Sequence, residues 1–206
     1  MGIPEPELTP KVRQAIMTLM QEVEGLRTEM ERVNSRLAHM ERLADQDTLV
    51  PVPNRRAFVR EMSRVISYNQ RYDAVSSLVY FDLNDFKQIN DKYGHAAGDA
   101  TLMHVAAALT ENLRESDMLG RLGGDEFGVI LSHTDAAQAL EKGRQLAHAI
   151  MAKPVDYEGA KITVTASYGI ATFKPGDSAQ EAMEAADRAM YEQKNALKSA
   201  VKPTPK

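Results

Sequence analysis

Near the start of the chain, apolar residues recur in steps that alternate between four and three positions, through a proline-free segment from about Lys11 to Gln46. Such alternation is a heptad repeat, which is typical of a coiled coil. Its a and d positions are Ile16, Val23, Met30, Leu37 and Ala44, and Val12, Leu19, Leu26, Val33 and Met40. The pattern predicts a long helix over residues 11–46, preceded by a flexible segment, 1–10.

Charges beside the apolar stripe indicate how two such helices would pair. In a parallel dimer Glu22 would face Arg27 and Arg36 would face Glu41, with opposite charges in both pairs. An amphipathic helix packed on its own domain would also show an apolar stripe, but it does not require a 3.5-residue period over several heptads. We therefore expect a parallel dimeric coiled coil and a homodimer, while other oligomeric states stay open.

Beyond Pro51 and Pro53 the period changes, and a globular domain is expected over residues 47–200, followed by a short tail, 201–206. Helical and alternating patterns follow one another in mixed order. The expected helices are 55–72, a short one within 84–94, 99–114, 136–151 and 179–197, and the expected strands are 76–83, a hairpin within 116–131, and 161–173. This order predicts an α+β fold, with a central, mostly antiparallel sheet flanked by helices.

Composition narrows the classes of function. The formal net charge is −4 and there is no cysteine, so neither a polyanion partner nor a thiolate metal site is favoured. The five histidines show no metal-ligand spacing. No apolar run approaches the roughly 20 residues that a membrane span needs, and the first residues do not resemble a signal peptide. We expect a cytoplasmic protein that binds neither membrane nor nucleic acid.

Two acidic segments carry the candidate chemistry. Gly123 and Gly124 permit a tight hairpin turn with positive φ, and Asp125 and Glu126 follow them directly. Asp82 ends an apolar strand, where a carboxylate is unusual unless it faces a site. If the strand and hairpin are neighbours, their acids converge and fit Mg²⁺ that bridges substrate phosphates. Alone, an acidic pair in a turn is more often a solvated tip.

The turn after this strand offers groups for a phosphorylated ligand. Residues 83–86 lead into a short helix, whose free amides could accept phosphate oxygens. Lys87 lies in its first turn. A polymerase palm uses a metal site of this kind to drive the attack of a hydroxyl on an α-phosphate.

Four ordered segments resemble the GGDEF domain of diguanylate cyclases, over roughly Asp47 to Lys198: "TLVPVPNRRAF", "FDLNDFKQINDKYGHAAGD", "RLGGDEF" and "AADRAMYEQK". The resemblance implies a palm-like cyclase fold. It also implies that two GTP molecules are condensed into cyclic di-GMP with release of two pyrophosphates, one GTP being held by each of two facing domains.

The resemblance also implies roles for individual residues. Asp82, the Leu83 carbonyl and Asp125 match the ligands of Mg²⁺, with Mn²⁺ as the alternative ion. Asp125 is a candidate for deprotonating the attacking 3′-hydroxyl, and Glu126 matches a signature acid without a separate role. Gly123 and Gly124 match positions that admit the nucleotide.

For GTP itself, the resemblance implies that Asn90 and Asp99 read guanine, that Lys194 and Lys198 hold the β- and γ-phosphates, and that the GTP-binding set includes Phe86 and Lys87. A carboxylate can accept from the N1–H and amino group of guanine, which adenine lacks. The alternatives are helix caps at Asn90 and Asp99 and a solvated last helical turn at the two C-terminal lysines.

A second ligand site is implied by "RESD", Arg114 to Asp117, which resembles the family's RxxD product-inhibition motif. The chain also departs from the family pattern: Leu49-Val50-Pro51-Val52 replaces the usual Leu-Thr-Gly-Leu, Tyr168 replaces a more usual aliphatic residue, and Lys198 stands where Arg is more common. Asn84 stands where Asp is common, so it is left out of the metal set. Two other functions stay open: a non-catalytic receptor for cyclic di-GMP, and a related cyclase with a different nucleotide product.

Overall fold

The computed structural model describes residues 9–201, without the side chains of residues 38–39, 41–43 and 196–201. Most of the segment expected to be flexible, 1–10, and nearly all of the expected tail, 201–206, lie outside this range. The chain divides into two compact units, the first ending at Ala44 and the second beginning at Asp45.

The first unit is almost entirely one helix, α1 (Pro10–Asp45), as the heptad pattern predicts. Its apolar heptad positions are exposed, apart from the half-buried Ile16: Leu19 by 59%, Leu26 by 64% and Met30 by 60%. A row of large apolar side chains in contact with water is costly, because each forgoes the free energy of burial.

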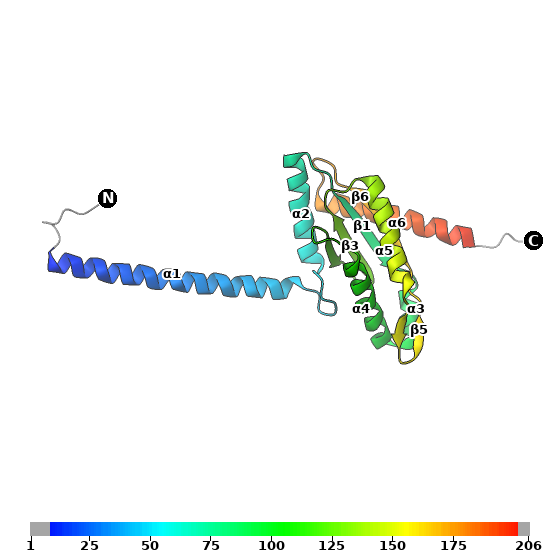
Figure 1. The fold of residues 1–206 in the computed structure, drawn as a ribbon, viewed down its shortest axis with the longest axis horizontal. Helices are drawn as coiled ribbons and strands as arrows, with labels where there is room; N and C mark the ends of the chain where they lie inside the picture. Colours follow the sequence, from blue (N-terminus) through cyan, green and yellow to red (C-terminus); the bar gives the residue numbers. More distant parts are fainter. Residues whose placement is uncertain (1–8, 202–206) are drawn as a thin grey trace, which may run out of the picture. The chain divides into compact units, whose positions relative to one another are not determined.

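The second unit is built on a four-stranded sheet in the order β2-β3-β1-β6 (Figure 1). Every neighbouring pair in it is antiparallel. The strands are β1 (Ser77–Leu83), β2 (Met118–Arg121), β3 (Glu126–Leu131) and β6 (Ala166–Thr172). The α+β fold expected from the sequence is confirmed, and β1 lies in the interior of the sheet.

Helices cover both faces of this sheet (Figure 1). Apolar residues of α2 (Arg55–Tyr72) and α6 (Ala179–Val201) pack against one face, and those of α4 (His95–Glu111) and α5 (Ala136–Ala152) pack against the other. The short helix α3 (Phe86–Tyr93) connects β1 to α4.

The alternation of β1 explains the two layers. Leu78 and Tyr80 belong to the α2–α6 side, whereas Val79, Phe81 and Leu83 belong to the α4–α5 side. Successive side chains of a strand point to opposite faces, so a continuous apolar run supplies both cores. Asp82 therefore lies on the α2–α6 side, at the end of the strand.

The strand expected over 161–173 is wrong in one respect, because it is divided between two sheets. Its first part is β5 (Ala160–Ile162), which pairs with β4 (Val155–Tyr157) in a separate hairpin. The two-residue turn of that hairpin, Glu158 and Gly159, has positive φ at both positions and closes a tight hairpin. Before β6, the main chain of Thr165 accepts a hydrogen bond from the Asn84 N–H at 2.8 Å.

Candidate functional site

The acids of the two predicted motifs meet where β1 ends and β3 begins. Asp82 and Glu126 are directly opposite in the antiparallel ladder. One residue further on, the Leu83 N–H donates to the Asp125 carbonyl at 3.1 Å. The convergence expected from the sequence is thus present at the level of the backbone, and it comes from the register of two central strands.

A cation from α6 completes this edge of the sheet. The ammonium of Lys194 forms an ion pair with Oδ1 of Asp82, and the two side chains are 26% and 18% exposed. Next to Lys194, α6 is also tied to the sheet, because the Tyr168 N–H donates to the Gln193 side chain at 2.8 Å. Lys198 lies one turn further along α6, and its side chain is outside the described residues.

The oxygen atoms at this edge suit a hard divalent cation. Carboxylates and a main-chain carbonyl are the ligands that Mg²⁺ and Mn²⁺ prefer, and Asp82 already holds a positive charge in the form of Lys194. Among the described residues no three acidic or histidine side chains are clustered as a ready metal cage. An ion there would therefore draw part of its coordination shell from water and substrate phosphates, as Mg²⁺ commonly does.

Glu126 is the first residue of β3, and its position is set by the register of that strand with β1. It is a diagonal neighbour of Tyr80 across the β1–β3 pair, on the same face of the sheet. Burial of the Tyr80 hydroxyl, and then the charge and hydrogen bond of Glu126, raise the pKa of Tyr80. The signature acid, for which no separate role was expected, thus lies close enough to a buried tyrosine to affect its pKa, and sequence reasoning missed this tyrosine.

The two glycines of the turn differ in their surroundings. A Cβ at Gly123 would overlap Oε2 of Glu126, whereas a Cβ at Gly124 would meet no atom within 4 Å. Neither glycine is among the residues with positive φ, so the turn does not use the conformation that glycine would permit. At Gly123 the missing side chain makes room for the carboxylate of Glu126, and at Gly124 it leaves the turn open to solvent.

The residues expected to read guanine lie at the junction of α3 and α4. Asn90 contacts Gly98, where a Cβ would overlap its Oδ1 atom and approach the Phe86 ring. Asp99 is exposed inside α4, because this helix begins at His95, earlier than the sequence predicted. Gly94, rather than Asn90 or Asp99, is the N-cap of α4, so the capping alternative is wrong for that helix.

The turn after β1 offers fewer free amides than the sequence predicted. The Leu83 N–H donates to the Asp125 carbonyl, and the Asn84 N–H donates to the Thr165 carbonyl. Phe86 and Lys87 open α3, where Phe86 packs against the core and Lys87 is exposed. The side chain of Lys87 is therefore accessible, and its contact with a phosphate stays a prediction.

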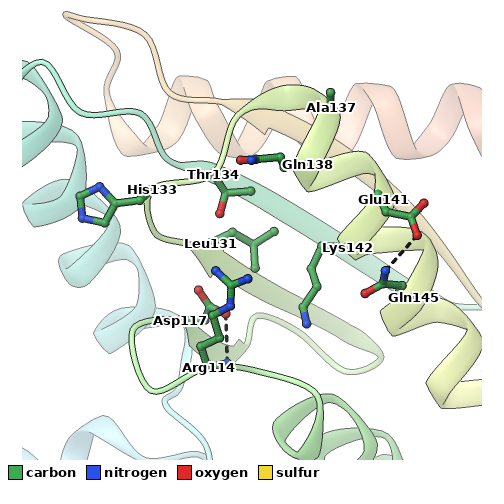
Figure 2. Close-up of a pocket in the computed structure, with 10 residues that line it drawn as sticks. All are labelled: Arg114, Asp117, Leu131, His133, Thr134, Ala137, Gln138, Glu141, Lys142 and Gln145. Atoms are coloured by element: carbon green, nitrogen blue, oxygen red, sulfur yellow. Dashed lines mark hydrogen bonds between the residues drawn. The ribbon is translucent and has the colours of Figure 1, made fainter.

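Arg114 and Asp117 line a pocket of about 490 Å³ between the segment before β2 and α5 (Figure 2). The carboxylate of Asp117 accepts a hydrogen bond from the main-chain N–H of Arg114 at 3.1 Å. Across the pocket, Lys142 donates to the Asn112 carbonyl at 2.6 Å. The predicted RxxD pair therefore borders a hollow, separate from the acids at the end of β1.

Sequence reasoning also missed Arg121, which precedes the glycines by two residues. Its guanidinium donates to the carbonyls of both Gly123 and Gly124, at 3.1 and 2.8 Å, and to the Asp47 carboxylate at 2.9 Å. Its place inside "RLGGDEF" was the available signal. What the sequence could not show is which groups the side chain contacts.

None of the helices in the described range is long and apolar enough to cross a membrane.

Comparison with known proteins gives consistent results. Residues 44–200 match the family described as "Diguanylate cyclase, GGDEF domain". The chain is 34% identical over 185 residues to diguanylate cyclase DgcP of Pseudomonas aeruginosa, covering 88% of this chain and 27% of that protein. It is 33% identical over 175 residues to diguanylate cyclase TpbB of the same species, covering 84% of this chain and 40% of that one.

Solved structures agree with these matches. The coiled coil and GGDEF domain of DgcB from Caulobacter crescentus, in complex with c-di-GMP, superposes with a TM-score of 0.75 at 26% identity, covering 87% of this chain and 95% of that one. The GGDEF domain of TpbB gives a TM-score of 0.69 at 34% identity, covering 73% of this chain and 89% of that one. The chain spans about a quarter to two fifths of the length of the two curated relatives named above. With the family matched over residues 44–200 and the two motifs joined at one edge of the sheet, this chain belongs to the GGDEF-domain family of diguanylate cyclases.

Proposed function

We propose that this chain is a diguanylate cyclase, which condenses two GTP molecules into cyclic di-GMP and releases two pyrophosphates. The observation that carries the proposal is the pairing of Asp82 with Glu126, with Asp125 beside Leu83, at the end of the central strand. Carboxylates packed together repel one another, and such a cluster costs stability unless it serves a cation or a substrate. The names of the curated relatives support the same activity.

The metal ligands in this proposal are Asp82, the Leu83 carbonyl and Asp125. A bound Mg²⁺ or Mn²⁺ would supply charge neutralisation for the triphosphate. Lys194 pairs with Asp82 in this structure, and it would be free to bind the phosphates of the same nucleotide once a metal ion neutralised that carboxylate. A single lysine can serve in this way because its flexible stem carries a compact positive charge.

The remaining roles follow from the reaction. The 3′-oxygen of one GTP forms a bond to the α-phosphorus of the other, pyrophosphate leaves, and Asp125 is the candidate to take the proton of the 3′-hydroxyl. A second bond of the same kind closes the ring. Asp99 would accept from the N1–H and amino group of guanine, and the amide of Asn90, oriented by its contact with Gly98, would donate to an acceptor on the guanine edge.

A dimer is part of the proposal, because each domain would contribute one loaded GTP. The exposed apolar stripe of α1 supports it, since a second copy of the helix would bury Leu19, Leu26 and Met30. Parallel pairing also brings Glu22 opposite Arg27. The rate would then depend on how the coil juxtaposes two half-sites.

Product inhibition is proposed for the pocket beside Arg114 and Asp117 (Figure 2). An arginine fork matches O6 and N7 of guanine, and an aspartate can accept from its N1–H and amino group. The DgcB structure named above was solved in complex with c-di-GMP, which supports a nucleotide of this kind as the ligand.

The test is to incubate the purified chain with Mg²⁺ and equimolar GTP and ATP, and to identify the products by mass. Cyclic di-GMP as the main product supports the proposal. A mixed cyclic dinucleotide would instead favour the related cyclase. If nothing forms, but added cyclic di-GMP binds and Arg114→Ala abolishes that binding, the chain is a receptor on a cyclase fold.

A further inference from the structure

Arg121 donates several hydrogen bonds around the turn of residues 122–125, called here the signature turn. Its side chain is 14% exposed. The Nε and Nη2 groups donate to the carbonyls of Gly123 and Gly124, and Nη1 donates to the Asp47 carboxylate, at distances of 2.8–3.1 Å. A planar guanidinium with several donors can fix such a geometry, which a lysine cannot.

Asp47 lies in the segment of residues 46–54, called here the linker loop, which follows α1 in the sequence. Its Oδ1 atom also accepts the N–H groups of Leu49 and Val50, at 2.9 and 3.1 Å. Burial opposes ionisation of this carboxylate, but those two amides and Arg121 outweigh it and lower the pKa of Asp47. One carboxylate thus organises the linker loop and orients Arg121.

The main chain joins the same two segments. The Arg121 N–H donates to the Pro53 carbonyl at 2.9 Å, and Asn54 forms a parallel bridge with Arg121. The loop is closed at its other end, where the Asn54 N–H donates to the carbonyl of Asp45, the last residue of α1, at 2.8 Å. Asp45 also forms ion pairs with Arg56 and Arg60 of α2.

We propose that Arg121 is a positioning residue, which holds the signature turn in its reactive geometry and links it to the linker loop through Asp47. Two adjacent glycines give the turn more conformational freedom than other residues would. The guanidinium restricts this freedom by occupying both glycine carbonyls, and thereby places Asp125 and Glu126. Because the linker loop begins where α1 ends, a change at the end of the coil reaches the acids through Asp47 and Arg121.

This inference rests on the proposed cyclase activity, and its test uses the full chain. The variants are Arg121→Gln, Asp47→Asn, the two combined, and Arg121→Lys. Arg64→Gln is the matched control, since Arg64 is an exposed arginine that pairs with Glu61 on the same helix. Each is assayed for GTP turnover, for affinity towards a non-hydrolysable GTP analogue with Mg²⁺, and for amide hydrogen exchange in residues 122–126.

We expect Arg121→Gln to lower kcat by about tenfold or more, with analogue affinity changed by less than about threefold. Amide exchange in residues 122–126 should accelerate. Arg121→Lys should restore only part of kcat, and the double variant should be no slower than Arg121→Gln alone, because both changes break the same link. The control should match the wild-type chain in all three measurements.

Several results would overturn the inference. They are an unchanged kcat in Arg121→Gln, an equal loss of kcat and of analogue affinity in that variant, or additive losses of kcat in the double variant. If Arg121→Gln fails to fold, Asp47→Asn, which keeps the arginine, carries the same test. If the wild-type chain makes no cyclic di-GMP, the proposed function fails, while hydrogen exchange still reports whether Arg121 holds the turn.

Discussion

Gly123 and Gly124 are adjacent in the sequence, but they contribute to the site for different reasons. Gly123 is required because the carboxylate of Glu126 fills the space beside its Cα atom. Gly124 faces open space, and neither residue needs the left-handed conformation that usually explains glycine in a turn. At the scale of residues, the site therefore depends on the position of the Glu126 carboxylate beside Gly123.

This difference predicts the outcome of two alanine substitutions. Gly123→Ala should displace the flexible end of Glu126, so turnover should fall by about tenfold or more while the unfolding temperature changes little. Gly124→Ala meets no atom and should leave the unfolding temperature unchanged or slightly higher. Turnover and thermal unfolding of both variants check this, and a large loss of stability in Gly123→Ala would contradict it.

Asp47 predicts a dependence of stability on pH. Its pKa in the folded chain is lowered below the ordinary value of 3.8, so its contribution is present at neutral pH and is lost as the pH falls through the lowered pKa. Asp47→Asn should therefore be less stable than the wild type by about 1–3 kcal/mol at pH 7. The difference should shrink below about pH 4, as followed by denaturant unfolding at both pH values. A difference that is constant with pH would exclude a role for the charge.

The residue types of the site could be predicted from the sequence, but their contacts could not. Asp82 stood out because a carboxylate ended an apolar run, and its partner Glu126 stood out because it followed two glycines. The pairing of Asp82 with Lys194 joins residues 112 positions apart in the chain, and no local pattern encodes it. The same is true of Arg121 with Asp47, 74 positions apart.

At the scale of elements, the boundary of a strand depends on its partners. Residues 161–173 alternate in a way that predicts one strand, yet β5 pairs with β4 and β6 pairs with β1. Alternation reports which face a side chain occupies, and it does not report the sheet to which the strand belongs. The helices and the hairpin were predictable, because their patterns are long or are bounded by turn residues.

The packing of α6 on β6 yields a prediction of its own. A Cβ at Gly169 would overlap the main chain of Ala186 and Met190, which cannot yield as a flexible side chain can. Gly169→Ala should therefore push α6 away from the sheet and destabilise the domain by about 3 kcal/mol. Turnover should fall as well, because α6 carries Lys194. Urea unfolding measures the loss, and wild-type stability in this variant would contradict the packing of α6 on β6.

At the scale of the whole molecule, pairing of α1 between two copies would bring two half-sites together in the proposed mechanism. The heptad repeat predicted the helix, and the register of the coil between two copies remains a prediction. In the proposed mechanism neither half-site would hold both reacting nucleotides, so activity should follow the dimer. This consequence distinguishes the account from a cyclase that works as a single domain.

A charge in the apolar stripe tests that consequence. Leu26→Lys should weaken the dimer, because two lysines would meet at a d position, and turnover per chain should then fall steeply on dilution. The single chain should stay folded, since Leu26 is 64% exposed in it. Sedimentation velocity and turnover over a range of concentrations check this. Full activity of a monomeric variant would rule out the dimeric mechanism.

The most direct test of the central claim is to compare Asp82→Asn with Asp85→Asn for the rate at which cyclic di-GMP forms from GTP and Mg²⁺. Asp82 is the proposed metal ligand. Asp85 lies three residues away with φ of 56°, a conformation that asparagine adopts readily, and accepts a hydrogen bond from Gln88. The account predicts a loss of at least about a hundredfold for Asp82→Asn and a change within about twofold for Asp85→Asn. Cyclic di-GMP formed at the wild-type rate by Asp82→Asn would contradict it.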